Sequence, residues 1–276
     1  MSSLSTPKPS ELNNVGVDCL LTGDPILSFK AFQTSIQLYR NQGMECVAAS
    51  SGSSKGIQQA PSCPIMTDTS VSVSPMMMDP FLSLVSSPDK AVGGRYYLSP
   101  IKVPCSSAGS RSSFFSDYDH CNLSICSAIS IFNMTVSIQS MSDEQARAAS
   151  QMEDRESRTM QLYKLCLSLT EAAMQDETLS VPALAVCDLI AMASLHNLVH
   201  LKMAQNQDRD APKLHGDDEA SMRIGSLLRM IADVESPSRY SGQPHIASWM
   251  QELSGRFGAQ AFAILGYIRG GAAPAA

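Results

Sequence analysis

The side chains best suited to bind a metal are two histidines on one predicted helix. His196 and His200 are four residues apart, so both imidazoles would lie on the same helical face, as two zinc ligands often do. The glutamate of a His-Glu-x-x-His site is absent, and the surrounding sequence offers no evident third ligand. We therefore expect both histidines to line a groove or a surface, and we predict no bound metal.

A second candidate cation site lies at residues 215–219, which read His-Gly-Asp-Asp-Glu. Carboxylates and an imidazole are suitable ligands for a divalent cation. Acidic residues are also favoured at a helix N-terminus, because they interact with the helix dipole. A helix is predicted to begin at Asp217 or Asp218, so helix capping is the preferred interpretation of this cluster.

The sequence contains no recognisable catalytic constellation. It has neither a G-x-S-x-G nucleophile elbow nor a phosphate-binding glycine loop. The eight cysteines are dispersed without C-x-x-C spacing, which indicates reduced thiols in a reducing compartment rather than a disulfide framework. We predict no catalytic residue, no cofactor and no enzymatic activity.

Three Ser-Pro dipeptides, at Ser87, Ser99 and Ser236, are candidate sites for proline-directed phosphorylation. A phosphate adds roughly −2 charge and would order or detach the segment that carries it. Such dipeptides are common in loops rich in serine and proline, so the pattern alone does not assign them a function.

Composition and charge favour a helical protein without a nucleic-acid partner. Aromatic residues make up only 6% of the 276 residues, whereas there are 16 methionines and many alanines, which are good helix formers. The net charge is −6 and no Lys/Arg-rich stripe is present, so nucleic-acid binding is not expected.

Neither a signal peptide nor a membrane span is expected. Residues 1–10 lack an apolar signal core. The longest charge-free stretch, residues 120–142, is interrupted by asparagine, serine, threonine and glutamine, which makes a transmembrane helix improbable. We predict an intracellular protein of the cytoplasm or nucleus, with no membrane partner.

Apolar periodicity divides the chain into helical and non-helical parts. Residues 11–41 are predicted to form a first helical pair, with a turn at Gly23-Asp24-Pro25 in which Asp24 caps the second helix. Residues 42–116 form a Ser/Pro-rich insertion that we predict to be disordered. Residues 117–269 are predicted to be a helical repeat domain, and residues 270–276 a disordered tail.

Two interpretations fit residues 95–103 within the insertion. This stretch contains two tyrosines, Leu98, Ile101 and Val103, so it is apolar enough to lie as an extended strip against the helices. Single short strands are rarely stable alone. We therefore favour a mobile loop that touches the core only transiently.

The helical parts resemble tetratricopeptide units, which are helix-turn-helix modules of about 34 residues. The residues that carry the resemblance in the first pair are Asn14, Gly16, Gly23, Asp24, Ser28, Phe32, Ser35, Ile36 and Leu38. Two longer units are similar: the second contains residues 131–134 with Thr159, Tyr163 and Cys166, and the third contains residues 195–198 with Ala220, Ile224 and Leu227. Three short motifs recur along them, Phe132-Asn133, Leu162-Tyr163 and His196-Asn197-Leu198. The order of these elements is similar to an expanded set of tetratricopeptide-like proteins from diatoms.

The resemblance implies an all-α fold: a degenerate tetratricopeptide-like array of about three helix pairs plus a C-terminal helix, with a long disordered insertion. Such arrays bind proteins on the concave surface of their first helices. Transferred to this sequence, that partner surface comprises Asn13, Val17, Phe132, Val136, Gln139, His196, His200 and Met203. We therefore predict a non-catalytic scaffold or adaptor for a protein or peptide. The alternatives are a helical metal-binding protein or enzyme that uses His196 and His200, and a lineage-specific protein that acts through its disordered segment.

Overall fold

The computed structural model describes residues 7–51, 96–103, 120–150, 154–176, 179–207 and 218–270. Most of these residues form α-helices, so the predicted all-α class is confirmed for this part of the chain. The helices are α1 (Pro9–Leu21), α2 (Pro25–Ser51), α5 (His120–Ser140), α6 (Asp143–Ser150), α7 (Arg155–Met174), α8 (Val181–Gln207), α9 (Asp218–Val234) and α10 (Pro244–Gly270).

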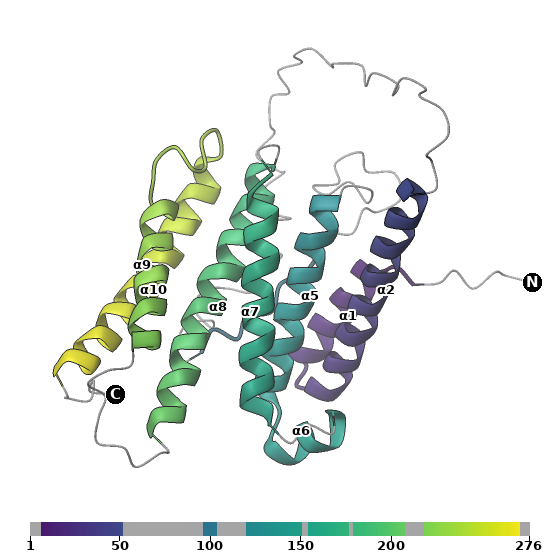
Figure 1. Cartoon of the computed structure of the whole chain (residues 1–276), viewed down its shortest axis with the longest axis horizontal. Helices are drawn as coiled ribbons and strands as arrows, with labels where there is room; N and C mark the ends of the chain where they lie inside the picture. Colours follow the sequence, from purple (N-terminus) through teal and green to yellow (C-terminus); the bar gives the residue numbers. More distant parts are fainter. Residues whose placement is uncertain are drawn as a thin grey trace, which may run out of the picture.

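The helices pack in the order in which they follow each other along the chain (Figure 1). Helix α1 packs on α2, α5 on α7, and α8 on α9, while α2 contacts α5 and α7 contacts α8. Helix α10 packs on α9 and also reaches α8. The first helices of the pairs meet as well, α1 with α5 and α5 with α8. Each pair thus covers an apolar face of its neighbour, and the buried residues form one continuous core.

The turn between α1 and α2 forms as the sequence predicts. Gly23 has a φ of 87°, a left-handed conformation that glycine adopts without strain. The Asp24 carboxylate accepts a hydrogen bond of 3.0 Å from the Leu27 amide, so it caps α2. A Cβ on Gly16 would lie 2.6 Å from the Phe32 ring, which shows how closely the two helices approach.

Helices α5 and α8 are apolar almost all round because they are buried on several sides. Both are long and apolar enough to cross a membrane by composition, over Leu123–Ser140 and Val181–Gln205. Within the protein, however, 72% and 89% of these windows are buried by other parts of the chain. Packing in a protein core therefore accounts for their hydropathy.

A buried ion pair fixes the connection between α9 and α10 onto α8. The Asp188 carboxylate is fully buried and binds the Arg239 guanidinium through two hydrogen bonds of 2.6 and 2.8 Å. The Tyr240 hydroxyl donates a third bond of 2.7 Å to the same carboxylate. The hydrogen bond to Asp188 raises the pKa of Arg239, so the guanidinium stays charged.

The observed boundaries differ from those predicted in two places. Helix α2 continues to Ser51, so the first helical pair extends beyond the predicted range 11–41. Residues 96–103, which were assigned to the disordered insertion 42–116, have a definite extended conformation against the helices. The rest of the predicted insertion beyond Ser51, and the predicted tail after Gly270, lie outside the described residues.

Candidate functional site

The most unusual feature of the structure is an extended segment, residues 96–103, which we call the strip. Alternate side chains of the strip are buried, since Tyr97, Ser99, Ile101 and Val103 are 1%, 6%, 0% and 2% exposed. Leu98, between the first two, is 37% exposed. This alternation is that of a β-strand with one buried face, and Pro100 departs from it because it is buried as well. The mobile loop that we favoured from the sequence is therefore wrong for these eight residues.

Three asparagines, one from the first helix of each pair, hold the main chain of the strip. We call Asn197 on α8, Asn133 on α5 and Asn14 on α1 the clamps. Each clamp accepts a hydrogen bond from the N–H of one strip residue and donates one to the C=O of the same residue. In each pair of distances below, the first is the hydrogen bond from the strip N–H and the second is the hydrogen bond to the strip C=O. They are 2.7 and 2.9 Å between Tyr97 and Asn197, and 2.8 and 2.6 Å between Ile101 and Asn133. Between Val103 and Asn14 they are 2.8 and 2.7 Å.

The clamps explain how the main chain of an extended segment can pack against helices. An asparagine side chain presents one acceptor and donors on a planar amide, as a peptide group does. Each clamp therefore replaces the pair of hydrogen bonds that a neighbouring antiparallel strand would make. The buried N–H and C=O groups of the clamped residues are satisfied in this way, which an apolar helix surface alone could not achieve.

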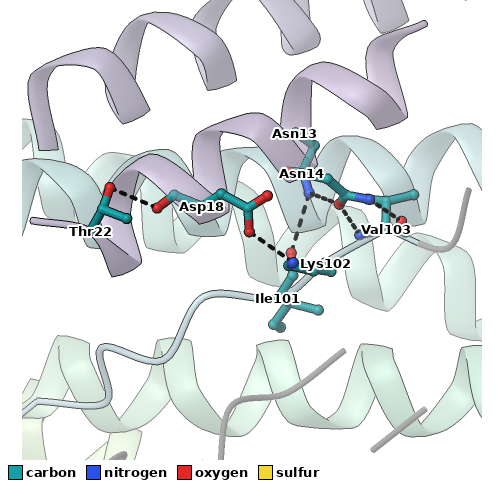
Figure 2. A network of polar contacts seen from close by, with 7 residues as sticks. All are labelled: Asn13, Asn14, Asp18, Thr22, Ile101, Lys102 and Val103. Atoms are coloured by element: carbon teal, nitrogen blue, oxygen red, sulfur yellow. Dashed lines mark hydrogen bonds and ion pairs between the residues drawn. The ribbon is translucent and has the colours of Figure 1, made fainter. Parts of the chain in front are cut away.

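Asn13 links the central clamp to helix α1. Its Oδ1 accepts hydrogen bonds of 3.1 Å from both the Asn133 amide and the Ser130 hydroxyl. Its own Nδ2 donates to the Ile101 carbonyl at 3.2 Å. Figure 2 shows Asn13 and Asn14 side by side on α1, facing Ile101 and Val103. The hydrogen bond between Asn133 and Asn13 orients the Asn133 amide independently of the strip.

Tyr163 on α7 orients the clamp at the other end of the strip. Its hydroxyl accepts a 2.7 Å hydrogen bond from Asn197 Nδ2 and donates one to Gln139. Burial raises the pKa of Tyr163 well above its ordinary value, so the hydroxyl keeps its proton and can donate. Both donor hydrogens of the Asn197 amide are thus used, one by Tyr163 and one by Tyr97.

Aromatic side chains surround the first residues of the strip. The ring of Tyr97 lies 5.6 Å from that of Phe257 and 6.2 Å from that of Phe132, measured between centroids. Tyr96 meets His200 edge-on at 5.9 Å. Such contacts stabilise by about 0.5–1.5 kcal/mol each beyond the area they bury. The Tyr97 side chain therefore anchors the strip, and burial raises the pKa of its hydroxyl.

At the other end of the strip, one ion pair connects an exposed side chain to α1. The Lys102 ammonium lies 2.8 Å from the Asp18 carboxylate, and both groups are substantially exposed, at 36% and 61% (Figure 2). Exposed pairs contribute about 0.2–1 kcal/mol. The pair therefore favours one register and direction of the strip more than it holds the strip in place.

The predicted partner surface is partly under the strip and partly in the core. Asn13, Phe132 and His200 contact strip residues. Val17, Val136 and His196 are buried, and the imidazole of His196 packs against His200 and Phe257. Gln139 accepts the hydrogen bond of Tyr163, and Met203 is a partly buried residue packed against the core.

In the part of the chain that the structure describes, the candidate metal ligands and thiols are not arranged as a metal or nucleophile site. Among the described residues, no group of three or more His, Cys, Asp and Glu side chains is close enough to hold a metal ion. The Cys166 thiol donates to the Ala128 carbonyl at 3.7 Å, and burial raises its pKa, which is the opposite of what a nucleophile needs. Glu219 of the acidic run 215–219 binds Arg223 and Lys202 instead, while residues 215–217 lie outside the described part.

The sequence does not predict the three clamps as binding residues. The signal was present, because an asparagine recurs on the first helix of each of the three pairs. We assigned to the partner surface the residues next to them, Asn13, Phe132 and His196, instead of Asn14, Asn133 and Asn197. Each of these predicted residues is one position before a clamp, so its side chain points about 100° away from that of the clamp around the helix axis.

Comparison with known proteins does not add to this description. No protein-family model matches the chain, and neither a curated protein nor a solved structure matches it significantly. The tetratricopeptide resemblance stays a prediction from the sequence.

Proposed function

We propose that this protein is a non-catalytic scaffold that binds an extended segment of a partner protein across the first helices of a tetratricopeptide-like array. The observation that carries the proposal is the set of three clamps, which hold the main chain of residues 96–103 on α8, α5 and α1. The partner would take the place of the strip. A reducing intracellular compartment, cytoplasm or nucleus, is the setting that we propose from the sequence.

The chemistry of the clamps suits recognition of a peptide. Main-chain hydrogen bonds are available to any extended sequence, so they supply affinity, while the pockets for alternate side chains supply specificity. In the strip the buried positions carry Tyr97, Ile101 and Val103. We therefore expect a partner segment with an aromatic residue, then a small residue two positions later, then two aliphatic residues at the next alternate positions.

The strip competes with such a partner because it belongs to the same chain. An intramolecular ligand has an effective concentration in the millimolar range for a short flexible connection, and less for a longer one. A partner at a lower concentration must therefore have a higher affinity for the site than the strip has, or the strip must first be weakened. The clamped site is in this respect a self-occupied binding site.

The proposal is tested with a fluorescent peptide that has the sequence of residues 95–104. The protein would be the full chain with Tyr97→Ala and Ile101→Ala, which weakens its own strip but keeps all three clamps. We expect saturable binding by fluorescence anisotropy, tighter than to the unmodified chain. Circular dichroism verifies that the helices of the variant are retained.

A matched peptide isolates the clamp contribution. N-methylation at the position of Ile101 removes the N–H that Asn133 accepts at 2.8 Å and keeps the side chain. Loss of this bond and exclusion of the methyl group should weaken binding by about tenfold or more. Equal binding of both peptides, or no binding of either to a folded variant, would refute a function based on the clamps.

A further inference from the structure

Ser99 is the one polar side chain in the buried row of the strip. It is 6% exposed and lies between Tyr97 and Ile101, the two residues held by Asn197 and Asn133. Pro100 follows it and is also buried. Ser99 and Pro100 form one of the Ser-Pro dipeptides that the sequence offers to proline-directed kinases, and the proposed function does not use it.

We propose that phosphorylation of Ser99 expels the strip from the clamps and so makes the site available to a partner. The consequence for a partner rests on the proposed function. The release of the strip does not, and it is measured separately.

The modification must occur on the detached strip. A protein kinase binds its substrate serine in an exposed, extended segment, whereas Ser99 is covered in the clamped state. With ATP as donor, the Ser99 Oγ forms a bond to the γ-phosphorus, the bond from that phosphorus to the β,γ-bridging oxygen breaks, and ADP leaves. The hydroxyl proton passes to the base of the kinase. Modification therefore captures a minor open state of the protein.

The phosphorylated strip cannot return to its place. A phosphoserine carries about −1.5 to −2 charge and needs hydrogen-bond donors for its oxygens. The flanking residues Tyr97 and Ile101 are packed in the apolar core, with two phenylalanine rings beside Tyr97. The nearest strip cation, Lys102, is already paired with the carboxylate of Asp18, which would itself repel the phosphate. Burial of an uncompensated charge is strongly unfavourable.

The chain contains a matched control for this test. Ser236 precedes Pro237, as Ser99 precedes Pro100, but it lies partly exposed in the turn between α9 and α10, where its hydroxyl pairs with Ser238 at 3.1 Å. Amide hydrogen exchange would be followed at Tyr97, Ile101 and Val103 in Ser99→Glu and Ser236→Glu. In Ser99→Glu we expect these three amides to exchange at least about ten times faster than in the unmodified chain, with helical content unchanged. In Ser236→Glu we expect no change in their exchange rates.

A second measurement avoids dependence on a mimic that fails to fold. The native full chain would be incubated with ATP and a purified proline-directed kinase, and phosphate at Ser99 and at Ser236 would be quantified by mass spectrometry. Asn197→Ala loosens one end of the strip, so it should accelerate modification of Ser99 and leave that of Ser236 unchanged. The phosphorylated protein should lose protection at the three clamped amides.

Each result decides one of the two proposals. If the clamped amides of protein phosphorylated on Ser99 keep their protection, or if Ser99 is modified at the same rate with and without Asn197→Ala, the switch is wrong. If phosphorylation releases the strip but the peptide of residues 95–104 still does not bind, the switch stands and the proposed scaffold function fails.

Discussion

The central clamp gives the sharpest quantitative prediction. Asn133→Ala removes the acceptor of the Ile101 N–H at 2.8 Å and the donors to the Ile101 C=O at 2.6 Å and to Asn13 at 3.1 Å. Each hydrogen bond contributes about 1 kcal/mol net, and an unpaired buried N–H adds about 1–3 kcal/mol. Because the Ile101 carbonyl retains its bond from Asn13, the loss comes from two hydrogen bonds and one unpaired N–H, and we expect a total destabilisation of about 3–5 kcal/mol.

The terminal clamp provides the comparison that makes this number informative. Asn14→Ala removes two hydrogen bonds of similar length, 2.8 and 2.7 Å, to Val103, and the acceptor of a longer bond of 3.3 Å from Asn13. Asn14 is only partly buried, and so are its hydrogen bonds with Val103, so water can replace its side chain there. We expect this variant to lose about 1 kcal/mol. The difference between the two variants, and not either value alone, tests the effect of burial.

The assay is urea denaturation followed by circular dichroism, combined with amide hydrogen exchange at Ile101. Asn41→Ala serves as the control, because Asn41 is exposed on α2 and should change the stability by less than about 0.5 kcal/mol. If the strip detaches in Asn133→Ala, the measured loss is limited by the free energy of detachment and Ile101 loses its protection. Equal losses in the two clamp variants, or full protection of Ile101 in Asn133→Ala, would refute the reasoning.

Four further substitutions test the helices that support the clamps. Gly16→Ala should destabilise the protein by about 1–3 kcal/mol, because the new methyl group overlaps the adjacent phenylalanine ring. Gly43→Ala on α2 meets open space and should stabilise it by up to about 1 kcal/mol. Asp188→Asn should lose about 3 kcal/mol, because Arg239 keeps its charge without a fully charged partner. Glu219→Gln should lose at most about 1 kcal/mol at neutral pH.

The pH dependence of the Glu219 variant has a definite sign. A hydrogen bond from Arg223, opposed by slight desolvation, lowers the pKa of Glu219 in the folded protein. A lowered pKa means that the stabilisation is complete above the ordinary pKa of glutamate and disappears as the pH falls through the folded pKa. The difference between the unmodified chain and Glu219→Gln should therefore vanish in acid. A difference that grows as the pH falls would contradict this assignment.

Urea denaturation at neutral pH measures the glycine and aspartate variants. Gly16→Ala and Gly43→Ala make the same chemical change on two neighbouring helices, so they separate steric overlap from helix propensity. Stabilisation by both glycine substitutions would mean that the approach of α1 and α2 is looser than the structure shows. For Asp188→Asn, an unchanged urea midpoint would mean that the ion pair with Arg239 contributes no stability beyond that of the neutral side chain.

The elements that could be predicted from the sequence are those set by local patterns. Apolar residues at helical spacing placed the helices, and the Gly23-Asp24-Pro25 turn was predicted from its capping chemistry. Helix ends were less accurate, since nothing in the local pattern of α2 distinguished residue 41 from Ser51 as its end.

The strip could not be predicted in the same way, because its stability depends on residues far away in the chain. A short apolar segment without a neighbouring strand has no obvious partner for its main chain, which led us to favour a mobile loop. The partners are helix side chains, and the Asn197 amide is 100 residues from Tyr97. A single sequence shows the three asparagines but not that they converge on one line.

The sequence separations within the strip site also set an order of events during folding. Contacts inside each helix pair join neighbouring parts of the chain, whereas the clamps join residues 100, 89 and 32 positions apart. Non-local contacts form late because they require the closure of long loops. We expect pulse labelling to detect protected helices before protected strip amides. A newly made chain would then pass through a stage with an empty apolar seam, when it is most exposed to aggregation and most open to capture by another protein.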